Sequence, residues 1–153
     1  MSGSVDAIIG AYWTHESIVM ELQGYEIEIM RLEEWGVPDY YELILITNKS
    51  FLEENKSEVE KVVNSFKKGY EFSIRNPQES ITSLISIVGE EIVEEDVERA
   101  GVELLIPMWQ SNNLPFGHQH ISKWEETYEW MYQNNFLEKE LIIENLFMDE
   151  FSN

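Results

Sequence analysis

Three short strand-like runs lie within the first 48 residues, and they constrain the fold more than any other feature of the sequence. VDAII at 5–9 and YELILIT at 41–47 are apolar runs typical of buried strands, and YEIEIMRL at 25–32 alternates apolar and acidic residues. A segment with helical spacing follows the first run and ends at Gly24, a natural helix stop. This order predicts a βαβ unit with a right-handed crossover.

The remainder of the chain has helical spacing and contributes no further strand. Asn76 and Pro77 are expected to end one helix and begin the next, and Pro107 is expected to stop a helix that begins near Val93. Three strands are too few for an ordinary doubly wound sheet. We therefore predict part of an α/β protein, with a short parallel or mixed sheet in residues 5–48 and a helical segment in residues 49–153.

Charge and cysteine content exclude several classes of function. Thirty acidic residues against ten basic ones give a net charge of −20, which argues against nucleic-acid binding because phosphate recognition needs clustered Lys and Arg. The chain has no cysteine, so it can form no disulfide, thiolate metal site or lipid-anchored N-terminal Cys. No apolar run reaches 18 residues, and Met1 to Ser4 do not resemble the start of a signal peptide.

The segment GAYWTHE at 10–16 is the first candidate site. It follows a predicted strand and begins a helix, and ligands of open α/β sheets bind at that end of the strands. Tyr12 and Trp13 offer rings that stack on a flat heterocycle, and Glu16 offers a carboxylate that accepts hydrogen bonds from amines. The alternative is that the two rings pack in a core while Glu16 caps the helix.

Two loops are weaker candidates. WGVPDYY at 35–41 contains Asp39, Tyr40 and Tyr41, with stacking faces and hydroxyl donors. A hinge or crossover held by aromatic packing explains these residues better than a binding site does. The 107–121 loop carries His118 and His120, which would point to opposite sides of an extended segment. Without a third ligand at suitable spacing, we predict no metal site there.

The sequence contains no motif of a known catalytic class. A Gly-rich phosphate loop, G-x-S-x-G and H-E-x-x-H are all missing. Paired carboxylates such as Glu53/Glu54 and Glu90/Glu91 are expected on the solvated face of so acidic a chain, so we give them no catalytic role. We predict no cofactor and no enzymatic activity.

Several runs resemble a known family across nearly the whole chain. VDAIIGAYW at 5–13, GVPDYYEL at 36–43, Asn76-Pro77 and FMDEF at 147–151 are similar to the C-terminal half of ABC-transporter solute receptors for thiamine pyrimidine precursors. These receptors are related to the yeast-type pyrimidine synthases. GAYW and GVPDYYEL carry most of the resemblance, because the helical stretches between them are not specific.

The resemblance implies two α/β lobes of the type II periplasmic-binding-protein kind, which close on a hydroxymethylpyrimidine or formylaminopyrimidine. It implies that Tyr12, Trp13 and Glu16 lie at the cleft and that Asp39, Tyr40 and Tyr41 lie at the crossover into the hinge. The resemblance implies an ABC-transporter permease as the partner. It also implies that the binding protein works outside the cytoplasmic membrane. The family's N-terminal half, which includes the secretion signal, the anchor Cys and the synthases' catalytic residues, is not found in this sequence.

These observations leave two main hypotheses about function, because a third, an enzyme of pyrimidine synthesis, needs the half that is not found here. The first is a non-catalytic binding module for a thiamine-precursor pyrimidine: the C-terminal part of a two-lobed receptor, with a separate N-terminal half or a second copy as a possible partner. The second is a dimerisation or interaction module with no affinity for small molecules, because an incomplete lobe would expose apolar surface that a second copy could cover.

Overall fold

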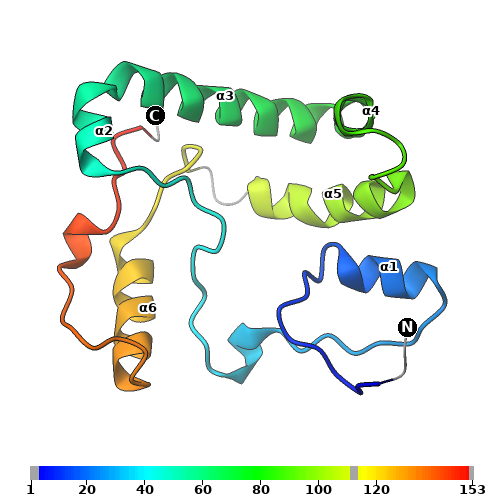
Figure 1. Cartoon of the computed structure of the whole chain (residues 1–153), viewed down its shortest axis with the longest axis horizontal. Coiled ribbons are helices and arrows are strands. Elements are labelled where there is room, and N and C mark those ends of the chain that lie inside the picture. The colour runs from blue at the N-terminus through cyan, green and yellow to red at the C-terminus, as the bar shows by residue number, and fades with distance from the viewer. Residues whose placement is uncertain (1–3, 111–113, 152–153) are drawn as a thin grey trace. The chain divides into compact units, whose positions relative to one another are not determined.

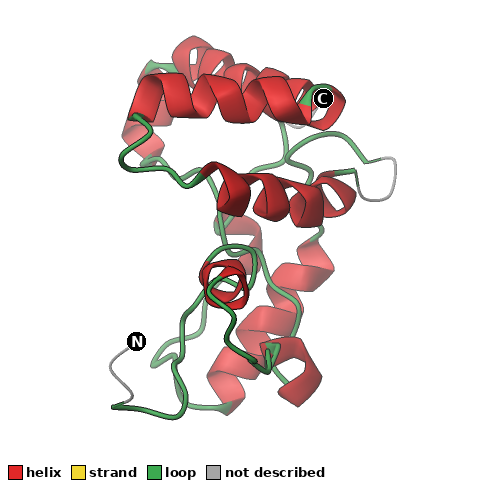
Figure 2. Ribbon diagram, turned by 90° about the vertical axis from the view of Figure 1, so that its right-hand side faces the viewer, coloured by secondary structure: helices red, strands yellow, loops and turns green. Residues whose placement is uncertain are grey.

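The computed structural model describes residues 4–110 and 114–151, and within them all regular structure is helical (Figure 1, Figure 2). The helices are α1 (Glu16–Leu22), α2 (Lys49–Glu54), α3 (Lys56–Arg75), α4 (Pro77–Val88), α5 (Glu95–Trp109) and α6 (Ile121–Gln133). Two short 3-10 helices, η1 (Leu32–Trp35) and η3 (Ile143–Asn145), accompany them. None of the described helices is long and apolar enough to cross a membrane.

The prediction of an α/β fold with a short sheet is wrong, because the described residues contain no strand. The runs at 5–9, 25–32 and 41–47 lie instead in loops, apart from the start of η1. A strand is stable only when a neighbouring strand pairs its N–H and C=O groups and covers its side chains. Here Ile9 is 92% exposed and Ile46 is 86% exposed, so neither run has such a neighbour.

The chain divides into two compact units. Unit 1 comprises residues 1–29 and 69–112, and unit 2 comprises residues 30–68 and 113–153. The chain passes from one unit to the other after residues 29, 68 and 112, and the second of these boundaries falls within α3. Each unit is described separately below.

Unit 1 is built on α5, which packs against both α1 and α4. Its core is small: Ile18 of α1, Ile81 of α4 and Val97 of α5 are its buried apolar side chains among the described residues. Gly101 lies where α5 meets the backbone of Thr14, so closely that a Cβ there would come within 2.6 Å of the Thr14 carbonyl oxygen. The helix pair α1–α5 therefore depends on a residue without a side chain at this position.

Unit 2 is held by α6 and the segments around it. α6 packs against η3, and the Trp124 and Phe147 rings stack with their centroids 5.7 Å apart. Lys56 pairs with Glu150 at 3.0 Å. Aromatic and ionic contacts therefore hold α6, η3 and the segments beside them.

Helix boundaries follow local signals in most places. α3 ends at Arg75 and α4 begins at Pro77 after the N-cap Asn76, as predicted. Gly24 adopts a φ of +83° beyond the end of α1, and the Gly24 and Tyr25 N–H groups donate to the Glu21 and Met20 carbonyls. These two bonds form the Schellman motif, which explains why α1 stops there.

The prediction for Pro107 is wrong, because α5 continues through it to Trp109. A proline inside a helix removes one backbone hydrogen bond and crowds the carbonyl four residues earlier. Only two residues of helix follow Pro107, so the disturbance is confined to the last turn. Residues 111–113 of the predicted 107–121 loop lie outside the described residues.

Candidate functional site

The GAYWTHE segment forms a compact turn at the start of α1 in unit 1. The Glu16 Oε2 atom accepts a hydrogen bond from the Tyr12 backbone N–H at 2.8 Å, and the Tyr12 carbonyl accepts from the His15 N–H at 3.0 Å. The His15 Nδ1 atom lies 3.7 Å from the Glu16 Oε1 atom. Glu16 therefore folds back over the turn, and the two aromatic residues lie within the loop that it closes.

The surroundings of the Glu16 carboxyl favour its ionised form. A backbone hydrogen bond from its own N–H lowers its pKa most, and the Tyr12 N–H and the neighbouring His15 act in the same direction. Partial loss of solvent opposes these effects without reversing them. At neutral pH the group is thus a carboxylate, and its remaining lone pairs can accept hydrogen bonds from a ligand.

The sequence left two interpretations of this segment open: core packing with Glu16 as a cap, or ligand binding. The structure has features of both. Glu16 does bond a backbone N–H at the start of the helix, as a capping residue would. Tyr12, however, is 45% exposed and Trp13 is half-buried, so the rings are not enclosed in a core. The segment combines a local structural bond with accessible aromatic surface.

The Asp39–Tyr41 segment belongs to unit 2, where two of its three side chains contact α6 or the residue before it. Asp39 Oδ2 lies 2.6 Å from Lys123 Nζ, and the Tyr41 hydroxyl accepts a hydrogen bond from the His120 N–H at 2.8 Å. The Tyr41 ring lies 6.0 Å from the Trp124 ring, centroid to centroid. Tyr40, between them, is 40% exposed.

A second set of contacts fixes the segment that precedes α6. Asp149 accepts from the Gln119 N–H at 3.0 Å and lies 2.6 Å from His118 Nδ1, and Gln119 Oε1 accepts from Trp124 Nε1 at 2.8 Å. The His118 and His120 rings meet edge to face, with centroids 4.7 Å apart. The two rings therefore do not point to opposite sides, as they would if the segment were regularly extended.

The six predicted site residues thus fall into two sets. Tyr12, Trp13 and Glu16 are together in unit 1, and Asp39, Tyr40 and Tyr41 are together in unit 2. No group of three or more His, Cys, Asp or Glu suited to a metal ion occurs in the described parts of the chain.

Sequence reasoning missed Lys123, which contacts Asp39 and Tyr41. It also missed Gln119 and Asp149, which contact Trp124 and His118. Lys123 gave one signal, since it and Lys139 are the only basic residues after Arg99 in a very acidic region. A cation with so many acidic neighbours in the sequence is a reasonable candidate for a specific ion pair. Nothing in the sequence pattern singles out Gln119 or Asp149, because their contacts join residues five and thirty positions apart.

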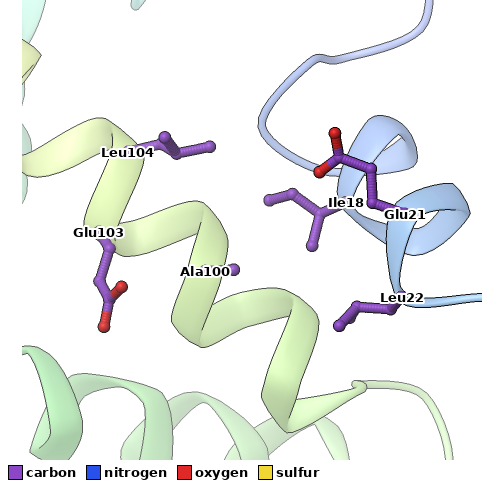
Figure 3. A pocket seen from close by; sticks show the side chains of 6 residues that line it. All are labelled: Ile18, Glu21, Leu22, Ala100, Glu103 and Leu104. Carbon is purple, nitrogen blue, oxygen red and sulfur yellow. The ribbon is translucent and has the colours of Figure 1, made fainter. Parts of the chain in front are cut away.

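An open groove of about 410 Å³ lies between α1 and α5 in unit 1 (Figure 3). Ile18 and Leu22 face it from α1, and Ala100 and Leu104 face it from α5. Glu21 and Glu103 complete its lining, and the Glu103 carboxylate points away from α1. The groove adjoins the helix that GAYWTHE begins, but its lining includes none of the predicted site residues.

Residues 1–80 match the family model described as NMT1/THI5 like, and the chain belongs to this family. The chain is also 32% identical over 150 residues to the formylaminopyrimidine-binding protein of Halalkalibacterium halodurans. That alignment covers 96% of this chain and 45% of the relative.

The comparisons confirm the resemblance to proteins that bind thiamine precursors, on which part of the sequence analysis rested. The named relative is a binding protein rather than an enzyme, which agrees with the prediction of a non-catalytic chain. The chain spans less than half of that relative's length. The ligand of the whole protein and its partners are therefore proposed, not shown.

Proposed function

We propose that this chain is part of a solute-binding protein for a thiamine-precursor aminopyrimidine, of the formylaminopyrimidine or hydroxymethylpyrimidine type. The protein would deliver this ligand to the permease of an ABC importer, on the outer side of the cytoplasmic membrane. The similarity to a formylaminopyrimidine-binding protein over 96% of the chain supports the choice of ligand class.

The observation that carries the proposal is the ionised Glu16 beside Tyr12 and Trp13. An aminopyrimidine is flat, aromatic and rich in N–H donors. Its ring can stack on an exposed aromatic side chain, and its exocyclic amine can donate to a carboxylate. Because Glu16 Oε2 is already bonded to the Tyr12 N–H, the carboxylate is held in a defined orientation before the ligand arrives.

Titration of the chain with formylaminopyrimidine, followed by tryptophan fluorescence, tests this function. We expect saturable quenching in the wild type. Glu16→Gln should weaken binding about tenfold or more, because it removes a charged acceptor. Trp13→Phe should reduce the signal while it preserves most of the affinity. Glu21→Gln, which alters a carboxylate on the same helix outside GAYWTHE, is the matched control and should bind normally.

The same substitutions belong in a chimera, because the relative is more than twice as long as the aligned region. In the chimera this chain replaces the matching segment of the Halalkalibacterium halodurans protein. Binding that is unaffected by Glu16→Gln in the chimera would rule out the proposed site. Binding by the chimera but not by the isolated chain would mean that the remaining half of the relative supplies necessary contacts.

A second function, association through apolar surface, is favoured by exposed apolar side chains in the described residues. In unit 1, Ile9 is 92% exposed, and in unit 2, Leu43 is 80% and Ile46 is 86% exposed. Exposed apolar runs of this kind are typical of surfaces that another chain covers. A mass that rises with concentration, together with no response to formylaminopyrimidine, would support this alternative.

A further inference from the structure

The α1–α5 groove of unit 1 is lined by apolar side chains and lies between two acidic helices (Figure 3). Leu22 of α1 is 59% exposed and Leu104 of α5 is 41% exposed, so both sides of the groove offer accessible apolar surface. α1 carries two acidic residues and no base, and α5 carries four acidic residues and one base. An apolar side chain is stabilised in such a groove, and the charge around it favours one that belongs to a basic segment.

α3 is the basic element of this acidic chain. It carries five of the ten bases and three of the thirty acidic residues. Lys61, Lys68 and Arg75 follow one another at intervals of seven residues, which is close to two helical turns, so they lie along one face of the helix. Phe72 lies on the same face, four residues after Lys68 and three before Arg75. These four residues are called the α3 ridge below.

The α3 ridge is open to solvent. Phe72 is 40% exposed, and the side chains of Lys61 and Arg75 are 71% and 67% exposed. Each of these two bases has an acidic neighbour at 3.7 Å on the same helix, and exposed ion pairs of this kind are weak. α3 buries none of its 20 residues in the described chain. An aromatic side chain flanked by bases is therefore accessible to another molecule.

The groove and the ridge are complementary in charge and in apolar character, and the groove and Phe72 both belong to unit 1. We propose that the α1–α5 groove is a docking site for the α3 ridge of a second copy of this chain. Phe72 of one copy enters the groove between Leu22 and Leu104 of the other. Lys68 and Arg75 then lie beside the acidic residues of α1 and α5. A groove of about 410 Å³ is large enough for one aromatic side chain.

The two surfaces differ, so the contact is head to tail. Each copy offers its groove to one neighbour and its ridge to another, and such a contact builds open chains of copies unless its geometry closes a ring. Attraction between the basic ridge and the acidic helices offsets locally the repulsion that a net charge of −20 produces. The contact goes beyond the proposed function, because the groove lining includes none of the proposed ligand residues.

Two matched variants test the contact. Leu22→Asp places a charge in the groove, and Phe72→Asp places the same charge on the ridge. Both side chains are partly exposed, so both variants should fold, which circular dichroism checks. Ile9→Asp and Ile46→Asp are present in every chain, so that the exposed apolar runs do not contribute. In sedimentation velocity the mass of this parent chain should rise above 18.0 kDa with concentration, and each variant should associate at least about tenfold more weakly.

A mixture of the two variants tests the head-to-tail arrangement. Leu22→Asp keeps an intact ridge and Phe72→Asp keeps an intact groove, so one copy of each can form a single contact. The mixture should therefore form pairs of twice the monomer mass and nothing larger. Val62→Asp adds the same charge to another face of α3 and should associate as the parent chain does. Leu104→Asp takes the place of Leu22→Asp if that variant does not fold.

Three results would overturn the proposal. The first is a parent chain that stays at 18.0 kDa, and the second is a pair of variants that associate as the parent chain does or stay monomeric when mixed. The third comes from the chimera: if Leu22→Asp destabilises it and Phe72→Asp does not, the remaining half of the relative covers the groove. Failure to bind formylaminopyrimidine, in contrast, overturns the proposed function and leaves this contact standing.

Discussion

Glu16 illustrates how one residue serves structure and, in our proposal, binding. Its carboxylate bonds the Tyr12 N–H four residues earlier, and this contact shapes the turn that carries Tyr12 and Trp13. Residue type and spacing were enough to select Glu16 from the sequence. They were not enough to choose between capping and ligand recognition, and the structure shows that the capping bond leaves the neighbouring rings accessible.

Titration of Glu16 should show a pKa below the ordinary value of 4.5, because backbone N–H groups and His15 favour the charged form. A lowered pKa stabilises the fold at pH values above the unfolded pKa. This contribution should be lost as the pH falls from about 4.5 through the lowered value. The effect is small because the side chain is about half exposed. Carbon-detected NMR of the carboxyl group measures it directly.

Two variants make that titration decisive. His15→Ala should raise the Glu16 pKa part of the way towards 4.5, since it removes one favourable interaction and leaves the backbone bonds. Glu16→Gln should flatten the pH dependence of the α1 amide signals between pH 3 and 5, roughly the range in which a carboxyl group titrates. A Glu16 pKa above 4.5 would contradict the hydrogen bonds described for the turn.

At the scale of the elements, α5 organises unit 1. It packs against α1 and α4, and it carries Val97, which is only 1% exposed, and Gly101, which touches the backbone of Thr14. Arg99 and Glu95 of α5 also bond Gln78 of α4. Substitutions on the buried face of α5 should therefore change the unfolding free energy of this unit more than substitutions on its exposed helix faces.

Gly101→Ala should destabilise unit 1 by about 1–3 kcal/mol, because the new Cβ would approach a carbonyl oxygen of the backbone that cannot move freely. Gly69→Ala in α3 is the matched control. A Cβ there meets nothing within 4 Å, and alanine should stabilise the helix by about 0.5–1 kcal/mol. Urea unfolding followed by circular dichroism compares the two, and equal effects would show that α1 does not pack on α5 as described.

Val97→Ala should cost about 2 kcal/mol, which is the transfer free energy of two methyl groups plus a small cavity term. Val62→Ala in α3 removes the same atoms from a side chain that is 50% exposed. It should change the unfolding free energy by less than about 0.5 kcal/mol. A Val97→Ala effect as small as this would mean that α4 and α5 do not share a core.

At the scale of the whole molecule, two properties oppose each other. The net charge of −20 makes copies of the chain repel, and the exposed apolar runs at 5–9 and 43–46 favour association. Salt screens the first and leaves the second intact. The balance between monomer and larger species should therefore depend on ionic strength.

Sedimentation equilibrium should show a mean mass that rises with salt and with protein concentration. Ile9→Asp and Ile46→Asp place charges in the two most exposed positions of the apolar runs and should lower that mass. Val62→Asp, on an exposed face of α3, is the control for added charge alone. A mass that stays at 18.0 kDa under all conditions would show that the exposed apolar surface is tolerated in the monomer.

The sequence by itself determined the features that depend on neighbours along the chain. Asn76 and Pro77 separate α3 from α4, and Gly24 ends α1, because caps and left-handed turns need only a few adjacent residues. The family and the choice of GAYWTHE as a candidate site were also within reach of the sequence. Both rest on runs of specific residues rather than on a three-dimensional arrangement.

The tertiary structure decided everything that depends on distant partners. The apolar runs at 5–9 and 41–47 have the composition of strands, but a strand exists only when another strand pairs with it, and in the described residues none does. Lys123 forms an ion pair with Asp39, which lies 84 positions away in the sequence. The His118 ring contacts the His120 ring, and His118 Nδ1 lies 2.6 Å from Asp149. Such contacts depend on how the chain packs, and packing is not encoded in any local pattern of residues.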